Sequence, residues 1–196
     1  MKKALLVLFT LVIISLVDIS CKTEHYLITD IQFSGAIIET YGDSKNSNVY
    51  QPTSEFTNSI AFVISYDVDF IAELLNISLS KKCYANTPKK VFDNELLMDT
   101  YSITLNKPFI YINDTIESES NLFSIPTIKN EISIFSNTMV FAGSGRGSDE
   151  VIEFSDEFIH NSQFDNESYQ IIFSCETSDN RQFIKNIEIK FNTNNK

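Results

Sequence analysis

Apolar and polar positions alternate most clearly along two segments near the C-terminus of the chain. In 169–175 the odd-numbered positions are all apolar or aromatic, and in 183–191 the apolar Ile187, Ile189 and Phe191 alternate with charged residues. A period of two residues is typical of a β-strand with one buried face. Because the polar segment 176–182 separates them, the two segments predict a β-hairpin that turns near Asp179-Asn180.

Further stretches are rich in β-branched and aromatic residues, which favour strands. The predicted strands cover 25–36, 60–68, 101–105, 109–112 and 131–142, with 60–68 as the central strand. The two segments on either side of Pro108 fit either two short strands or one strand bent at the proline. Segment 70–80 fits either a helical turn or a strand.

Two polar stretches, 37–59 and 81–99, predict long loops. Together the segments predict a mostly β fold with little helix, namely an antiparallel β-sandwich of immunoglobulin-like architecture. Tyr169 follows a turn at the start of a strand. Such folds often place a tyrosine there, and its hydroxyl fixes the corner.

The N-terminal residues have a different pattern. Lys2 and Lys3 precede an uncharged apolar run over 4–17, which is shorter than the roughly 20 residues that a membrane-spanning helix needs. A basic start, a short apolar region and a small residue before the cut are typical of a cleaved export signal. The sequence therefore favours a signal over a membrane-spanning anchor.

The end of this segment resembles the lipobox of bacterial lipoproteins, in the looser form of the Bacteroidetes. Ser20 supplies the small residue before Cys21, and Asp18 stands where leucine is usual. The resemblance implies that 1–20 is a lipoprotein signal peptide that is removed, and that Cys21 becomes the acylated first residue. Two or more acyl chains give stable membrane attachment. The alternative is a secreted protein in which Cys21 is incidental.

This interpretation of the N-terminus divides the chain into three parts. Residues 1–20 are the signal peptide, 21–24 are the lipidated cysteine and a short tether, and 25–196 form a single β-sandwich domain. The implied location is the periplasmic or cell-surface face of the outer membrane, with the lipid anchor as the membrane contact.

Two cysteines lie beyond the anchor, Cys83 and Cys175. An even pair in an exported chain is typical of a disulfide, although two buried free thiols fit the sequence equally well. Cysteine and histidine residues at the spacing of metal ligands are missing, so the sequence predicts no metal site and no cofactor.

The formal net charge is −11, and removal of 1–20 with Lys2 and Lys3 leaves an even more acidic chain. Such a chain as a whole repels nucleic acid and anionic lipid headgroups, so we expect neither as a partner. The lysines within 81–90 are expected to form a solvated edge that discourages strand pairing.

A wider resemblance rests on 102–109, on 112–116, on Asn121-Leu122 and on the C-terminal hairpin. These segments look like those of a group of uncharacterised Bacteroidetes surface lipoproteins, which implies a location and a fold class but no chemistry. Within them, Asp114-Thr115-Ile116 is similar to the tripeptide at which Bacteroidetes attach O-glycans to exported proteins. The resemblance makes Thr115 a candidate glycosylation site.

Other polar groups have simple interpretations. The glycine-rich 143–148 lacks the lysine of a phosphate-binding loop and is expected to be a flexible loop. The carboxylates of 149–157 share a face only if this segment is helical, and a solvated acidic face is the expectation. His25 and His160 have no partner pattern and are expected at the surface. The sequence therefore predicts no catalytic residue.

Two classes of function remain. The first is a non-catalytic binding or interaction module on the cell surface, which contacts an unknown protein or glycan through loops around 41–56 and 141–164. The second is a glycan-processing hydrolase that uses a pair of acidic side chains. The hydrolase requires two converging carboxyl groups roughly 5 to 10 Å apart.

Overall fold

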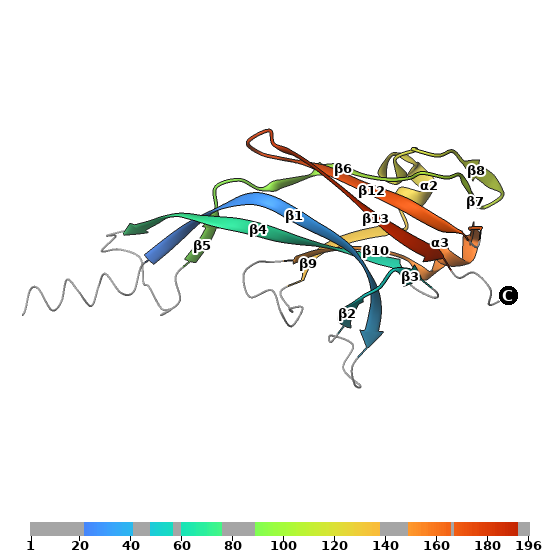
Figure 1. Ribbon diagram of the computed structural model, residues 1–196, viewed down its shortest axis with the longest axis horizontal. Helices are drawn as coiled ribbons and strands as arrows, with labels where there is room; N and C mark the ends of the chain where they lie inside the picture. Colours follow the sequence, from blue (N-terminus) through green and yellow to red (C-terminus); the bar gives the residue numbers. More distant parts are fainter. Residues whose placement is uncertain are drawn as a thin grey trace, which may run out of the picture. The chain divides into compact units, whose positions relative to one another are not determined.

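Strands make up most of the chain that the structure describes. The computed structural model describes residues 22–40, 48–56, 60–75, 89–137, 149–165 and 167–191 (Figure 1). These residues form two compact units: 22–28, 68–75 and 89–95 belong to unit 1, and the others belong to unit 2. The long strands β1 (Lys22–Thr40) and β4 (Ile60–Leu75) contribute residues to both units.

Unit 1 contains the start of β1, the end of β4 and the short strand β5 (Lys89–Phe92). β5 pairs in parallel with β1, so that Thr23 lies opposite Lys89 and Tyr26 lies opposite Phe92. The buried Asn94 extends this pairing, because its side chain accepts a hydrogen bond from Ile28 N at 2.8 Å and donates one to Ile28 O at 3.2 Å. A side chain thus forms hydrogen bonds with both the N–H and the C=O of a strand residue.

Unit 2 contains two larger sheets and one small sheet. The strand order of the first sheet is β2 (Asn48–Pro52), β1, β4, β10 (Asp149–Phe154) and β9 (Ile132–Asn137). The order of the second sheet is β3 (Glu55–Phe56), β13 (Gln182–Phe191), β12 (Ser168–Thr177) and β6 (Leu96–Leu105). The small sheet contains β11 (Ser162–Gln163), β7 (Phe109–Tyr111) and β8 (Asp114–Ile116).

Short helical turns flank the strands of unit 2. They are η1 (Leu122–Ser124), α2 (Pro126–Lys129) and α3 (Asp156–Asn161). Ser155 caps α3, since its side chain accepts a hydrogen bond from Phe158 N at 3.2 Å. Asp156 and Glu157 follow in the first turn, where the helix dipole favours negative charge.

The two larger sheets of unit 2 pack face to face and form the predicted β-sandwich. Phe33 of β1 stacks on Phe173 of β12 with 4.9 Å between ring centroids. At Gly35 the sheets approach so closely that a Cβ atom would lie 2.9 Å from Ile189 Cδ1. The mostly β fold and the sandwich are confirmed, whereas the immunoglobulin-like arrangement stays a prediction.

The C-terminal hairpin matches its prediction. β12 and β13 pair antiparallel from Ser168↔Lys190 to Glu176↔Gln182. Asn180 closes the turn with a φ of 64°, a conformation that asparagine tolerates. The hydroxyl of Tyr169 accepts a hydrogen bond from Asp165 N at 3.1 Å, so the tyrosine fixes the corner before β12 as expected.

The central strand and the segments around Pro108 also match. β4 lies between β1 and β10, and Ile60 to Ile64 are all buried. Proline separates two strands, β6 and β7, rather than bending one.

Two predictions of loop structure were wrong in the described residues, and of the two alternatives for 70–80 the described part is the strand. Within 37–59, β1 continues to Thr40 and the strands β2 and β3 follow. Within 81–99, β5 and the start of β6 are strands, and within 70–80 β4 continues to Leu75. β3 and β5 pair with the distant strands β13 and β1, whereas β2 pairs with β1, which directly precedes it, and such pairing overrides local preference.

Candidate functional site

A group of polar side chains lies between the sheets of unit 2 around Glu150. Glu150 is on β10 opposite Ile64 of β4, and alternation puts it on the same face as the buried Ile152 and Phe154. Its side chain is only 8% exposed. A carboxyl group in such a place needs hydrogen-bond donors, because burying it without them costs several kcal/mol.

Two tyrosines provide these donors. The hydroxyl of Tyr101, on β6 of the opposite sheet, donates a hydrogen bond to Glu150 Oε2. Tyr66 of β4 also bonds to Glu150, and burial followed by the nearby Glu150 charge raises the pKa of this phenol. Burial and the Glu150 hydrogen bond likewise raise the pKa of Tyr101. Both tyrosines therefore remain protonated donors at neutral pH.

Cys175 on β12 completes this group, which we call the Glu150 cluster: Tyr66, Tyr101, Glu150 and Cys175. Its side chain is fully buried, and burial together with the Glu150 charge raises the pKa of the thiol to about 12. The thiolate is the nucleophilic form of cysteine, so Cys175 is a poor nucleophile at neutral pH. The predicted bond to Cys83 stays a prediction, because Cys83 lies outside the described residues.

The acidic residues of 149–157 do not share one helical face. The segment is a strand followed by a short helix, so the helical face considered above does not form over its first half. Glu150 points between the sheets, and Glu153, three residues along the same strand, lies on the other face. Burial and the charge of Asp156 raise the pKa of Glu153. Glu150 and Glu153 therefore point to opposite faces of β10 and do not form the acid pair of a hydrolase.

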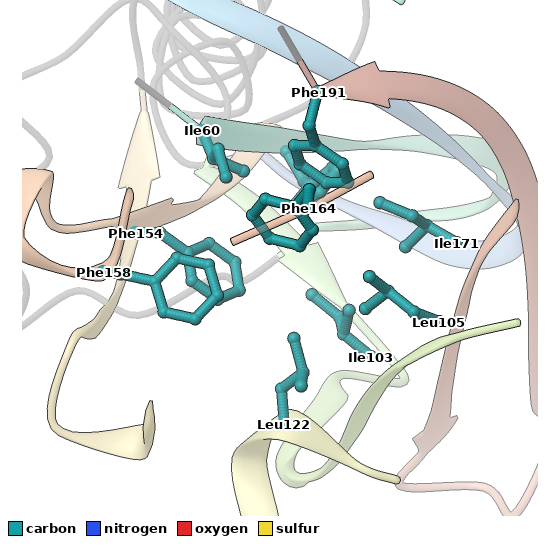
Figure 2. A pocket seen from close by; sticks show the side chains of 10 residues that line it. Ile60, Ile103, Leu105, Leu122, Phe154, Phe158, Phe164, Ile171 and Phe191 are labelled. Carbon is teal, nitrogen blue, oxygen red and sulfur yellow. The ribbon is translucent and has the colours of Figure 1, made fainter. Parts of the chain in front are cut away.

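Apolar side chains close the remainder of the sandwich interior. Figure 2 shows Ile103, Leu105 and Ile171 on one side of a small cavity, opposite Phe154 and Phe158. The cavity has a volume of about 10 Å³ and exclusively apolar lining residues. This is near the lower limit for one water molecule, so the cavity is a packing void and not a ligand site.

The hairpin of β7 and β8 has an unusual turn. Tyr111 pairs with Asp114, which leaves Ile112 and Asn113 as a two-residue loop with φ values of 48° and 69°. These values are those of a type I′ turn, which favours asparagine and glycine. A β-branched residue at positive φ is an outlier. Ile112 is nevertheless 52% exposed, and Ile110 on the same hairpin is 39% exposed.

The other candidate residues have varied surroundings. Thr115 is exposed on β8, next to this turn. His25 is not an isolated surface residue, because its Nδ1 lies 2.6 Å from Asp93 Oδ1, whereas His160 is exposed on α3. Among the described residues, no group of three His, Cys, Asp or Glu side chains is arranged to hold a metal ion.

Several predicted features lie outside the described residues. They are the signal segment 1–20, Cys21, Cys83, the glycine-rich 143–148 and two parts of the contact loops, 41–47 and 141–148. The described parts of these loops, 48–56 and 149–164, are mostly strands and the helix α3. No helix in the described ranges is long and apolar enough to cross a membrane.

The sequence analysis missed both the Glu150 cluster and the strained turn. The sequence contains a signal for Glu150. Glu150, Ile152 and Phe154 occupy alternate positions, so a strand over this segment places the carboxyl group on the same face as the two apolar side chains. The partners of Glu150 come from distant strands and leave no local signal. For the turn, the sequence does not show where β7 ends and β8 begins. The pairing of Tyr111 with Asp114 defines these ends and leaves a loop of two residues.

No protein family, curated protein or solved structure matches this chain. The proposed function therefore rests on the geometry of the described residues.

We expect Tyr101→Phe to lower the free energy of unfolding by about 1 to 3 kcal/mol, because it removes a buried donor to Glu150. Urea denaturation measures this change. Tyr111→Phe, at another buried tyrosine, is the matched control and should have a smaller effect. In a double-mutant cycle with Glu150→Gln, the Tyr101→Phe change should depend on residue 150. Simple addition of the two effects would show that the bond contributes nothing.

We expect Cys175 to resist thiol reagents at neutral pH in a folded Cys83→Ser variant, and to react once urea unfolds the chain. Equal rates in both states would contradict the burial of this thiol. The folded chain holds a proton that the unfolded chain releases above the ordinary thiol pKa of 9.0. The free energy of unfolding should therefore fall as the pH rises from about 9 to about 12, as denaturation at stepped pH would measure.

Proposed function

We propose that this protein is a lipid-anchored, exported β-sandwich domain that acts as a non-catalytic binding module at the membrane surface. The β7–β8 hairpin is its contact site for a partner protein. The observation that supports this is the exposed, strained Ile112 at the tip of the hairpin.

The strain supports a contact role because it lowers stability without improving the fold. A left-handed conformation costs an ordinary residue roughly 1 to 2 kcal/mol, and asparagine or glycine at the same position avoids most of this. Since more than half of the Ile112 side chain is exposed, burial within the chain does not offset the cost. Strained residues cluster at functional positions, so the isoleucine is best explained by contact with a partner.

The surroundings of the hairpin define the chemistry of the partner. Ile110 and Ile112 are apolar and exposed, and three exposed acidic residues follow them closely: Asp114, Glu117 and Glu119. An apolar pocket with lysine or arginine at its rim complements this arrangement. This site replaces the loops considered in the sequence analysis as the primary contact.

A glycan hydrolase has less support. Glu150 is enclosed by tyrosines, the cavity of the sandwich is apolar, and Glu150 and Glu153 point to opposite faces of β10. An exposed Thr115 beside the contact site is compatible with glycan attachment there.

We expect Ile112→Asn to raise the free energy of unfolding by about 1 kcal/mol, because asparagine tolerates positive φ. The same variant should lose partner binding. A photoreactive amino acid at position 112, in the native host, should form one discrete adduct that Ile110→Asn suppresses. Ile184, which is 61% exposed, is the matched control position and should not form that adduct. The same adduct from both positions would contradict a specific contact at the hairpin.

We expect the mature protein from detergent-extracted membranes to begin at Cys21 and to have the added mass of acyl chains. Intact-mass measurement checks this, and Cys21→Ser is the control that should remain unacylated. An uncut or unacylated wild-type chain would contradict the lipid anchor. The crosslinking experiment tests the hairpin contact independently of this result.

A further inference from the structure

The small sheet of unit 2 ends at β8, and the outer edge of β8 pairs with no described strand. The strand order is β11, β7, β8, so β7 lies between the other two. Ile112 N, just beyond β7, donates a hydrogen bond to Asn161 O at 3.1 Å, and Gln163 of β11 lies opposite Ile110. Backbone groups two residues apart point to the same side of a strand. The N–H and C=O of Ile110 therefore point toward β11 and away from β8.

The direction of the Ile110 groups determines the direction of the backbone groups of Thr115. Thr115 lies opposite Ile110 in the antiparallel pair of β7 and β8. In such a pair, opposed residues that exchange two hydrogen bonds alternate with opposed residues that exchange none. Because Ile110 faces β11, the Ile110 and Thr115 pair exchanges none, and the N–H and C=O of Thr115 point outward from the edge of β8. No residue that the structure describes bonds to either atom.

The side chains along this edge are acidic and apolar. Asp114 and Glu117 flank Thr115 at exposed positions, and the exposed Glu119 follows. Thr115 shares a face of the sheet with the exposed Ile110, because opposed residues of an antiparallel pair point the same way. The edge thus combines two free backbone groups, negative charge and an exposed apolar side chain.

The charge of the edge decides which strand can join it. Opposite charges on neighbouring strands stabilise their pairing, and like charges weaken it. A second copy of this chain would bring the same carboxylates of Asp114 and Glu117 together at the joint edge. Lys107, which precedes β7, does not offset these charges, because its Nζ pairs with Glu167 at 2.5 Å. The edge therefore complements a basic segment of another protein and disfavours its own copy.

We propose that β8 binds an extended segment of the partner protein as an added antiparallel strand, with lysine or arginine opposite Asp114 and Glu117. This inference deepens the proposed function and rests on it for the β7–β8 hairpin as the contact site. Thr115 N–H donates a hydrogen bond to the partner backbone, and Thr115 C=O accepts one from it. Added strands of this kind gain affinity from the main chain and specificity from alternate side chains.

The test uses the isotope-labelled mature chain with Cys21→Ser and a capped synthetic peptide in which two lysines enclose a valine and a threonine. This peptide places its lysines opposite Asp114 and Glu117. We expect it to slow hydrogen exchange at the Thr115 amide, as NMR measures, and to leave the Ile184 amide unchanged. A peptide with glutamate in place of both lysines is the matched control and should not protect Thr115.

Two variants test the backbone contact itself. Thr115→Pro removes the outward N–H but no hydrogen bond of the hairpin, and proline is tolerated where an edge N–H faces solvent. We expect it to weaken peptide binding about tenfold, as measured from the NMR signals of neighbouring residues, because one hydrogen bond is lost. The matched Thr115→Val keeps the N–H and a branched side chain and should retain binding. A circular dichroism spectrum unchanged in both variants confirms that both chains are folded, and the exchange measurement on Thr115 itself needs neither variant.

Three results would overturn the added strand: no protection of Thr115 at millimolar peptide, equal protection by the glutamate peptide, or equal losses in Thr115→Pro and Thr115→Val. A concentration-dependent dimer that Thr115→Pro abolishes would also overturn it, because the edge would then bind a second copy. The crosslink at position 112 separates this proposal from the proposed function. An adduct that survives Thr115→Pro would keep the hairpin contact and reject the added strand, whereas a missing adduct would reject the hairpin contact in the host.

Discussion

Aromatic packing between the two sheets is the interaction on which unit 2 depends. The chain has 16 phenylalanines and no tryptophan, and many of the rings meet in the interior of the sandwich. Phe33 stacks both on Phe62 of its own sheet and on Phe173 of the other, and the ring centroids of Phe164 and Phe191 are 3.9 Å apart. Each buried ring removes a large apolar area from water, and its rigid plane limits how the sheets align. Both the burial of apolar area and the fit between the rings therefore hold the two sheets together.

The Glu150 cluster interrupts this apolar interior at one place and explains why the sheets have a single alignment there. Apolar side chains tolerate small displacements, but Glu150 on β10 must meet Tyr101 on β6 to satisfy its buried oxygen. Sliding one sheet along the other would leave a polar group without its partner. Elsewhere in the sandwich, Lys185 Nζ lies 2.8 Å from Asp30 Oδ1, which links β13 to β1 across the sheets. Specific polar contacts therefore complement the less specific aromatic packing.

The fold was predictable where the information is local and unpredictable where it depends on pairing between distant strands. The alternation in 169–191 and the apolar run in 60–68 identified β12, β13 and β4, and Tyr169 identified the corner before β12. The short strands β3 and β5 contain polar residues, and their pairing with the distant β13 and β1 makes them strands. For the same reason the partners of Glu150 are not visible in the sequence, because the packing of β6 and β4 around β10 brings Tyr101 and Tyr66 to it.

Strand pairing also determines where the charged residues lie relative to one another. Averaged over the chain, an excess of acidic residues argues against contact with any anionic surface. The parallel pairing of β5 with β1 places Lys89 opposite Thr23 and Lys90 opposite Glu24, so basic and acidic residues lie together in unit 1, where Asp69, Asp93 and Glu95 are exposed. The exposed acidic residues after Ile112 lie on β8 and in the segment that follows it, within unit 2. The acidic residues that follow Ile110 and Ile112 therefore give the proposed contact site a negative edge, which a basic rim on a partner protein would complement.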